Sequence, residues 1–144
     1  MLRTIVFLLA ALVVMPTFAS PNIDALSKCI ADNSTSKDRR NYGLFIIVSM
    51  SAHPEMQSIS TIAPGALDST GKVAGTTITR LITESCQTEA RAAIRSDGAS
   101  AMWAAFGDLF RVAMLELLID KDVQASINIL DKYSDKNKFE ALGR

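Results

Sequence analysis

Few residues of this chain could support catalysis. His53 is the only histidine, and Cys29 and Cys86 are the only cysteines. Hydrolysis by a Ser-His-Asp or Cys-His arrangement requires the histidine beside a nucleophile and an orienting acid. The sequence has no Gly-x-Ser-x-Gly motif to present such a serine. Because His53 directly precedes Pro54, we interpret it as a residue at the C-terminal end of a helix, where it meets the helix dipole favourably.

The sequence lacks the residue patterns that are typical of metal and cofactor sites. A zinc site needs three or four ligands at recognisable spacing, and one histidine with two distant cysteines does not supply it. The sequence has no glycine-rich phosphate loop. Carboxylates such as Glu84, Glu89, Asp97 and Glu116 could form an acid/base pair, but nothing in their spacing demands one. We therefore expect no metal, no cofactor and no enzymatic activity.

The stretch CIADNSTSKDRRNYG, from Cys29 to Gly43, holds a second candidate site, Asp38-Arg39-Arg40. Asp, Asn, Ser and Thr favour caps and turns, and an acidic residue suits the first turn of a helix. One interpretation is a helix start in which the arginines are solvated or paired with nearby acids. The other is contact with an anion or a partner through Arg39 or Arg40. We favour the helix start and keep three candidate binding residues, Arg39, Arg40 and His53.

The N-terminal residues resemble an export signal. Arg3 is followed by an apolar run from Ile5 to Met15, and Pro16 and Ala19 then mark a cleavage site. Eleven apolar residues are fewer than the ~20 that a membrane span needs, so an uncleaved anchor is the weaker alternative. We expect cleavage after Ala19, which leaves residues 20–144 as one domain, with no stable membrane anchor.

The charge and the cysteine content of the chain limit further the classes of protein to which it could belong. Without Arg3 the chain keeps 14 basic and 15 acidic residues, which does not fit a nucleic-acid binder. Exported chains form disulfides, so we predict a Cys29–Cys86 bond, with two buried free thiols as the alternative. Closing a loop of this length contributes on the order of 4 kcal/mol in the chain-entropy model.

Helical periodicity runs through the chain. We expect a first helix capped by Asn22, a second from Ser36 to the residues before Pro54 that is buried on most faces, and a short third helix starting at Pro54. The run Leu44–Val48 alone could be a strand, but its length and cap favour a helix. Apolar residues four apart predict one long helix through Ile78–Ile94.

The C-terminal half is also expected to be helical. Residues 99–120 are apolar nearly all round, so we predict the central core helix there, with Trp103 buried and Asp108 paired with Arg111. A last amphipathic helix runs through Val123, Ile127, Leu130 and Tyr133, and a tail carries Phe139 and Leu142. The predicted fold is an all-α, single-domain bundle of about five or six helices with one disulfide.

Three stretches, CIADNSTSKDRRN, SAHPE and LITESC, resemble a set of short exported bacterial proteins with a helical domain and no assigned activity. The resemblance implies a Gram-negative periplasmic setting. It brings no catalytic residues.

Two functions stay open from sequence. The first is a non-enzymatic periplasmic protein that binds a protein partner, in an inhibitor, immunity-like or accessory role. The alternative is a carrier of a small apolar ligand, with Trp103, Phe106, Phe110 and the methionines lining a pocket.

Overall fold

A computed structural model describes residues 20–143 of the chain, and over this range it contains helices and no strand. The predicted export signal and its cleavage site therefore fall outside the described residues, except for Ser20. The elements are α1 (Pro21–Asn33), α2 (Ser36–Met50), α3 (Pro54–Gln57), α4 (Ala66–Arg80), the π-helix η1 (Leu81–Ser85), α5 (Gln87–Asp97), α6 (Ser100–Leu118), α7 (Lys121–Ile127), α8 (Leu130–Tyr133) and α9 (Lys136–Ala141). The all-α prediction is confirmed, and the run Leu44–Val48 is helical.

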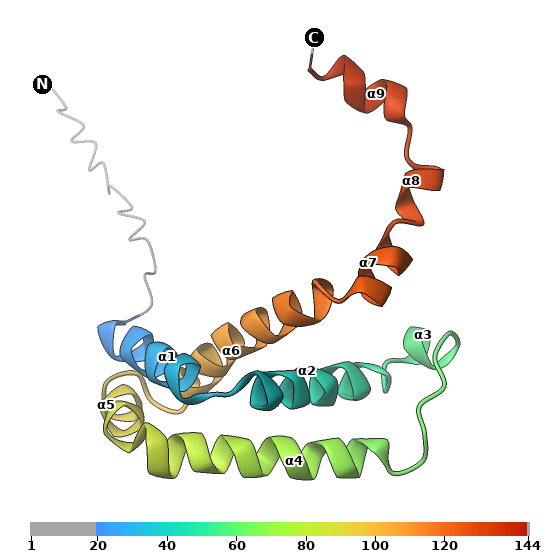
Figure 1. Cartoon of the computed structure of the whole chain (residues 1–144). Coiled ribbons are helices and arrows are strands. Elements are labelled where there is room, and N and C mark those ends of the chain that lie inside the picture. The colour runs from blue at the N-terminus through green and yellow to red at the C-terminus, as the bar shows by residue number, and fades with distance from the viewer. Residues whose placement is uncertain (1–19, 144) are drawn as a thin grey trace, which may run out of the picture.

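Helices α1, α2, α4, α5 and α6 form the body of the molecule (Figure 1). α2 packs between α4 and α6, and α1 packs against α5 and α6. The core is built largely from small and aliphatic side chains: Leu26, Ile30, Ala74, Leu81, Ala90, Ala93, Ala101, Ala105 and Leu109, with Tyr42 and Phe106. A side chain on Gly43 would meet the Cε of Met114 at 3.0 Å, so this glycine allows α2 and α6 to approach closely.

Helix starts follow local capping chemistry. The Ser20 hydroxyl accepts from the Ile23 N–H at 3.3 Å, so the cap of α1 is Ser20 rather than the predicted Asn22. The same hydroxyl donates to the Asp97 carboxylate at the end of α5. A serine is as good a cap as asparagine, and its contact with Asp97 ties the start of α1 to α5.

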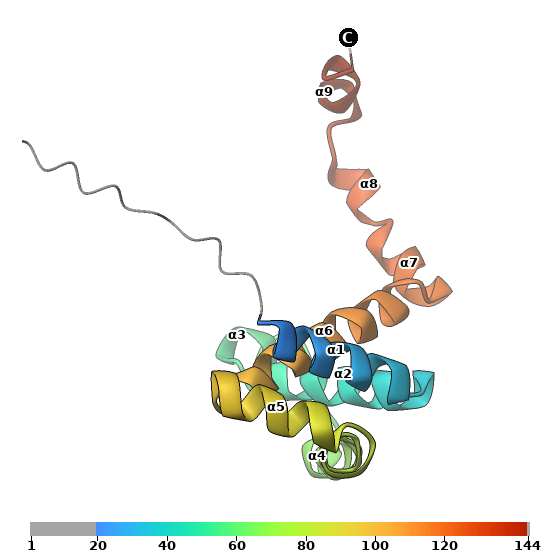
Figure 2. The same cartoon turned by 90° about the vertical axis from the view of Figure 1, so that its left-hand side faces the viewer.

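The disulfide prediction is confirmed, because Cys29 of α1 and Cys86 are bonded, with their Cα atoms 5.8 Å apart. The prediction of one continuous helix through Ile78–Ile94 is wrong, because the helix is interrupted at Cys86. The Cys86 N–H bonds to the Leu81 carbonyl, five residues back, at 2.8 Å, which is the π-helical pattern. The chain turns there, so that α4 lies on α2 while α5 lies on α1 (Figure 2).

The burial predicted for α6 is only partly correct. Ala101, Ala105 and Leu109 line its inner face, but Trp103 is 81% exposed, so the prediction that Trp103 is buried is wrong. α6 packs on α1, α2 and α5 from one side and has no described helix over the other. Asp108 and Arg111 pair at 3.9 Å as predicted. Over residues 20–143, no helix combines the length and apolar character that crossing a bilayer requires.

The last predicted helix is divided in the structure. α7, α8 and α9 follow one another away from the body in both views (Figures 1 and 2). We call residues 121–143 the C-terminal arm. Asn128 and its β-branched neighbours Ile127 and Ile129 weaken helix continuation at the break between α7 and α8. Phe139 and Leu142 of the tail are exposed.

Candidate functional site

The three residues predicted to bind lie at opposite ends of one helix. Arg39 and Arg40 are in the first turns of α2, and His53 follows its end. At a rise of about 1.5 Å per residue, about 15 Å of helix lies between Arg40 and the end of α2 at Met50, and His53 lies beyond that end. The two arginines and His53 therefore cannot form one small-molecule site, and the surroundings of each residue are described separately.

Arg39 is used inside the molecule. Its Nε and Nη2 each lie 2.7 Å from Oε1 of Glu116 in α6, and its Nη1 donates to the Ser34 carbonyl at 2.6 Å. Its side chain is only 17% exposed. The guanidinium therefore joins α2 to α6 and to the α1–α2 linker, which is a structural role. The pairing with an acid that the sequence suggested is present, with an acid 77 residues away.

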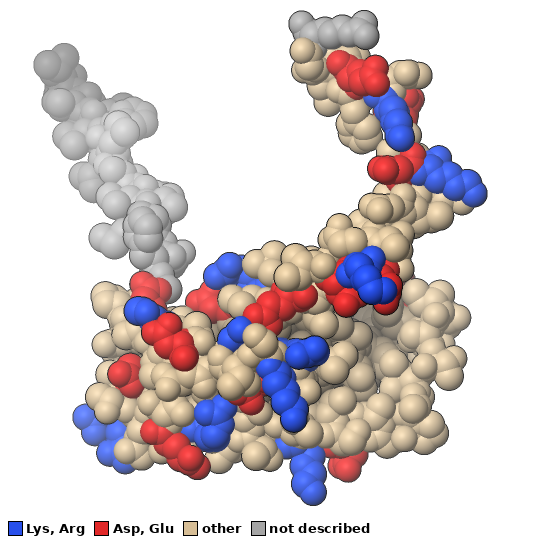
Figure 3. Space-filling model, in the orientation of Figure 1, with Lys and Arg blue, Asp and Glu red and all other residues tan. Residues whose placement is uncertain are grey.

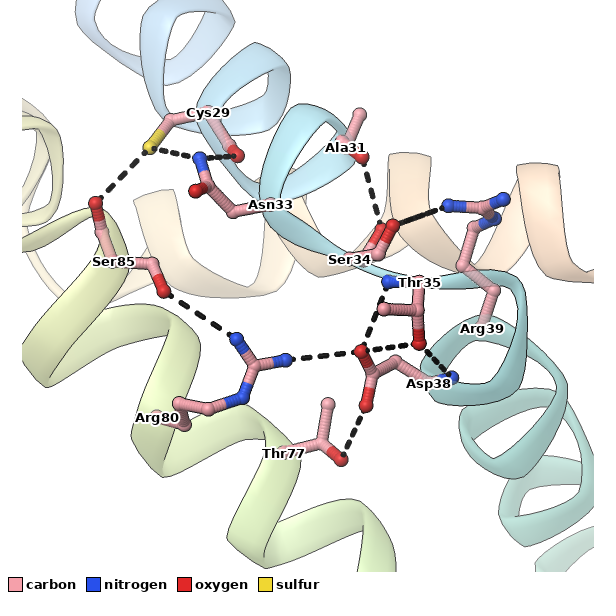
Figure 4. Close-up of polar contacts among 10 residues, drawn as sticks. All are labelled: Cys29, Ala31, Asn33, Ser34, Thr35, Asp38, Arg39, Thr77, Arg80 and Ser85. Carbon is pink, nitrogen blue, oxygen red and sulfur yellow. Dashed lines mark hydrogen bonds and ion pairs between the residues drawn. The ribbon is translucent and has the colours of Figure 1, made fainter.

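Asp38 forms the predicted helix start. It completes a capping box, because Asp38 Oδ2 accepts from the Thr35 N–H at 2.9 Å while the Asp38 N–H donates to Thr35 Oγ1 at 3.1 Å. Arg80 Nη2 donates to the same carboxylate oxygen at 3.0 Å (Figure 4). Burial raises the pKa of Asp38, but the Thr35 hydrogen bonds, the Arg80 charge and the Thr77 hydroxyl together hold that pKa below its usual value.

The Arg80 side chain extends from this cap toward the disulfide. Its Nη1 donates to the Ser85 hydroxyl at 3.4 Å, and the Ser85 carbonyl oxygen lies 3.7 Å from Cys29 Sγ (Figure 4). Asp38, Arg39 and Arg80 thus join α2 to α4 and to α6. We assign this cluster to stability, as the helix-start interpretation expected for Asp38.

Arg40 differs from its neighbour. Its side chain is exposed, and no described residue forms an ion pair with it. It lines a surface hollow of about 390 Å³ together with Ser36, Glu116 and the α6–α7 corner residues Ile119 and Asp120. Arg40 is therefore available to a partner, beside the base of the C-terminal arm.

His53 lies between two helices and caps the second of them. Its Nδ1 accepts from the Glu55 N–H at 3.3 Å, so it caps the start of α3. It also lies just past the C-terminal end of α2, where the sequence placed it, and its backbone N–H donates to the Met50 carbonyl at 3.0 Å. The ring is exposed beside Met50 and Met56 and borders an open hollow of about 570 Å³.

A surface that the sequence interpretation missed surrounds His53. Between residues 41 and 71 the chain has only two formal charges, Glu55 and Asp68. This segment exposes large apolar side chains to between 37% and 77%: Leu44, Ile47, Met50, Ile59, Ile62 and Leu67. We call these residues, with His53 and Met56, the low-charge end. Figure 3 shows this end of the body almost free of charged atoms, whereas charges gather over α1, α5 and α6.

The low-charge end corrects the prediction that the second helix is buried on most faces. α4 and α6 cover two sides of α2, with Tyr42 and Gly43 inside, but Leu44, Ile47 and Met50 stay in solvent. The sequence feature that could have indicated this exposed surface is the lack of charged residues in the second half of α2. An exposed helix normally carries a polar face, and the second half of α2 has none.

The aromatic residues expected to line an apolar pocket do not all lie together, since Phe106 and Phe110 belong to the core and Trp103 does not. Phe106 is buried against Tyr42, with their ring centroids 5.8 Å apart, while Trp103 points into solvent from the same helix. Among residues 20–143, no group of three or more histidines, cysteines and acidic residues could hold a metal ion.

Comparisons with protein-family models, curated proteins and solved structures find no match to this chain. Its class therefore rests on its own fold. It is an all-α domain with a disulfide between α1 and the start of α5.

Proposed function

We propose that this chain is exported to the periplasm and acts there, without catalysis, by binding a protein partner through the low-charge end. Export is supported by the signal-like N-terminal residues and by the disulfide, since disulfides persist in oxidising compartments. An inhibitor or accessory role suits a small domain of this kind.

One observation carries the proposal: six large apolar side chains are exposed within 31 residues that hold two formal charges. Monomeric proteins rarely expose contiguous apolar patches of more than a few hundred Å² unless the patch binds something. The centres of protein interfaces are likewise depleted of charge and enriched in methionine and aromatic residues. Met50 and Met56 add an adaptable surface around His53.

Comparative capture from periplasmic extract tests this function. The processed chain is immobilised as wild type, as Ile47→Asp/Met50→Asp, and as a control with Ile94→Asp, a similarly exposed residue on α5. We expect proteins held by the wild type and by the control to be lost from the double variant. Equal retention by all three would show that the low-charge end does not carry the contact.

A further inference from the structure

The C-terminal arm has a conformation that its own residues do not explain. α7, α8 and α9 are seven, four and six residues long, and isolated helices of fewer than ~12–15 residues are marginal in water. Within residues 20–143, the arm's contact with the body is concentrated where α7 meets α6. The arm's helices therefore lack the packing on the body that normally stabilises short helices.

The arm carries the side chains for a contact with another surface. Its exposed large apolar residues are Ile127, Ile129, Leu130, Tyr133, Phe139 and Leu142. Its charges cancel, with four lysines and four acidic residues between 121 and 143, so it has no electrostatic preference for a charged surface or for an anionic membrane. The matching surface is apolar and nearly uncharged, as the low-charge end is.

The arm does not reach the low-charge end of its own copy. Asp120 caps α7 by accepting from the Asp122 N–H at 2.9 Å and the Val123 N–H at 3.3 Å. The Gln124 side chain also donates back to the Leu118 carbonyl at the end of α6. These bonds set the direction in which α7 leaves α6, and that direction is away from the body (Figure 2).

From these observations we propose that the low-charge end binds the C-terminal arm of a second copy of this chain, in a reciprocal exchange. This inference rests on the proposed protein-binding role of that end and names its partner. One arm against one low-charge end would bury roughly 600–900 Å², counting both surfaces, which is less than the ~1,200 Å² at which specific, stable interfaces begin.

Exchange of two arms doubles this area to roughly 1,200–1,800 Å², the size of a specific interface. A closed twofold pair uses the same two patches on both copies and leaves neither exposed. The surface area that a stable interface must bury therefore favours a second copy of this chain over a single unrelated helix as the partner.

The test is the mass of the processed chain in solution at ~100 μM, measured by light scattering after size exclusion. We expect twice the chain mass for the wild type and for the Ile94→Asp control. Leu130→Asp/Tyr133→Asp in the arm and Ile47→Asp/Met50→Asp in the low-charge end should each weaken the dimer at least tenfold. Circular dichroism confirms that the variants fold, since all four positions are exposed.

A cross-link locates the contact independently of these variants. A photoreactive residue replaces Tyr133 in isotope-labelled chains mixed with unlabelled ones. We expect labelled arms joined to unlabelled peptides from residues 41–71. Cross-links between two arms, or a wild-type chain that runs as a single copy, would overturn the exchange. Capture of another protein that is lost with Ile47→Asp/Met50→Asp would still support the proposed function in that case.

Discussion

Arg39 of α2 and Glu116 of α6 are joined by two guanidinium nitrogens that each lie 2.7 Å from one carboxylate oxygen. The adjacent Arg40 forms no ion pair with any described residue. Two neighbouring arginines thus serve different purposes, and substitutions can separate them.

We expect Arg39→Ala to lower the free energy of unfolding by about 1–3 kcal/mol, because it leaves Glu116 and the Ser34 carbonyl without a charged donor. Arg40→Ala should change it by no more than about 0.5 kcal/mol. Urea unfolding measures both. A double-mutant cycle with Glu116→Ala should give a coupling energy for Arg39 and none for Arg40, and equal effects of the two arginines would contradict the assignment.

The lowered pKa of Asp38 predicts a pH dependence of stability. A carboxyl whose folded-state pKa lies below its unfolded value of about 3.9 contributes stability above that value. This contribution is lost as the pH falls through the folded pKa. Asp38→Asn keeps an acceptor for the Thr35 N–H but removes the charge facing Arg80. We expect it to cost roughly 0.5–1 kcal/mol at pH 7, since Arg80 is partly exposed.

The check is to unfold the wild type and Asp38→Asn in urea between pH 7 and pH 2.5. The difference between them should be constant down to about pH 4 and should then shrink. A difference that grew on acidification would mean that the carboxyl is not stabilised in its charged form.

The Cys29–Cys86 bond closes a loop across 57 residues. In the chain-entropy model this contributes about 4 kcal/mol, so reduction, or the Cys29→Ala/Cys86→Ala variant, should lower the melting temperature by many degrees. Calorimetry with and without reductant measures this. The reductant should have no effect on the double variant, which serves as the control. A wild-type protein whose melting temperature is unchanged by reduction would not contain the bond.

The exposure of Trp103 gives an optical prediction. A tryptophan that is 81% exposed should emit at the long wavelengths typical of water and should be quenched readily by iodide. Addition of a partner should change this emission only if the partner covers α6. Blue-shifted emission that iodide cannot reach would restore the buried position that periodicity suggested.

Periodicity was sufficient for most of the helices, and the cysteine pairing followed from the presence of only two cysteines in a chain with an export-like N-terminus. Periodicity failed where tertiary packing decides. The turn at Cys86 is invisible in a four-residue spacing that continues through it, and Trp103 lies in a run that is apolar on every side, so periodicity could not tell the covered face from the open one.

The candidate site was recovered only in part for a related reason. A search for charged or catalytic residues finds Arg39, Arg40 and His53, whereas the low-charge end is defined by the charges that it lacks. The partner of Arg39 could not be predicted either, since Glu116 is 77 residues away and is only one of fifteen acidic residues. Which of Leu44, Ile47 and Phe45 faces solvent depends on where α4 and α6 pack.

The central claim is that the low-charge end carries the contact with protein, and photo-cross-linking inside cells tests it most directly. A photoreactive residue is placed at Ile47, Met50 or Ile59 in the low-charge end, or at Arg91 or Thr83 on the far side of the body, each in the full chain expressed in cells. Because the residues 41–71 surface is apolar and open, the account predicts discrete, mass-identifiable protein adducts at all three low-charge positions and none at the two control positions. Adducts that appeared equally at Arg91 and Thr83, or at none of the five positions, would contradict it.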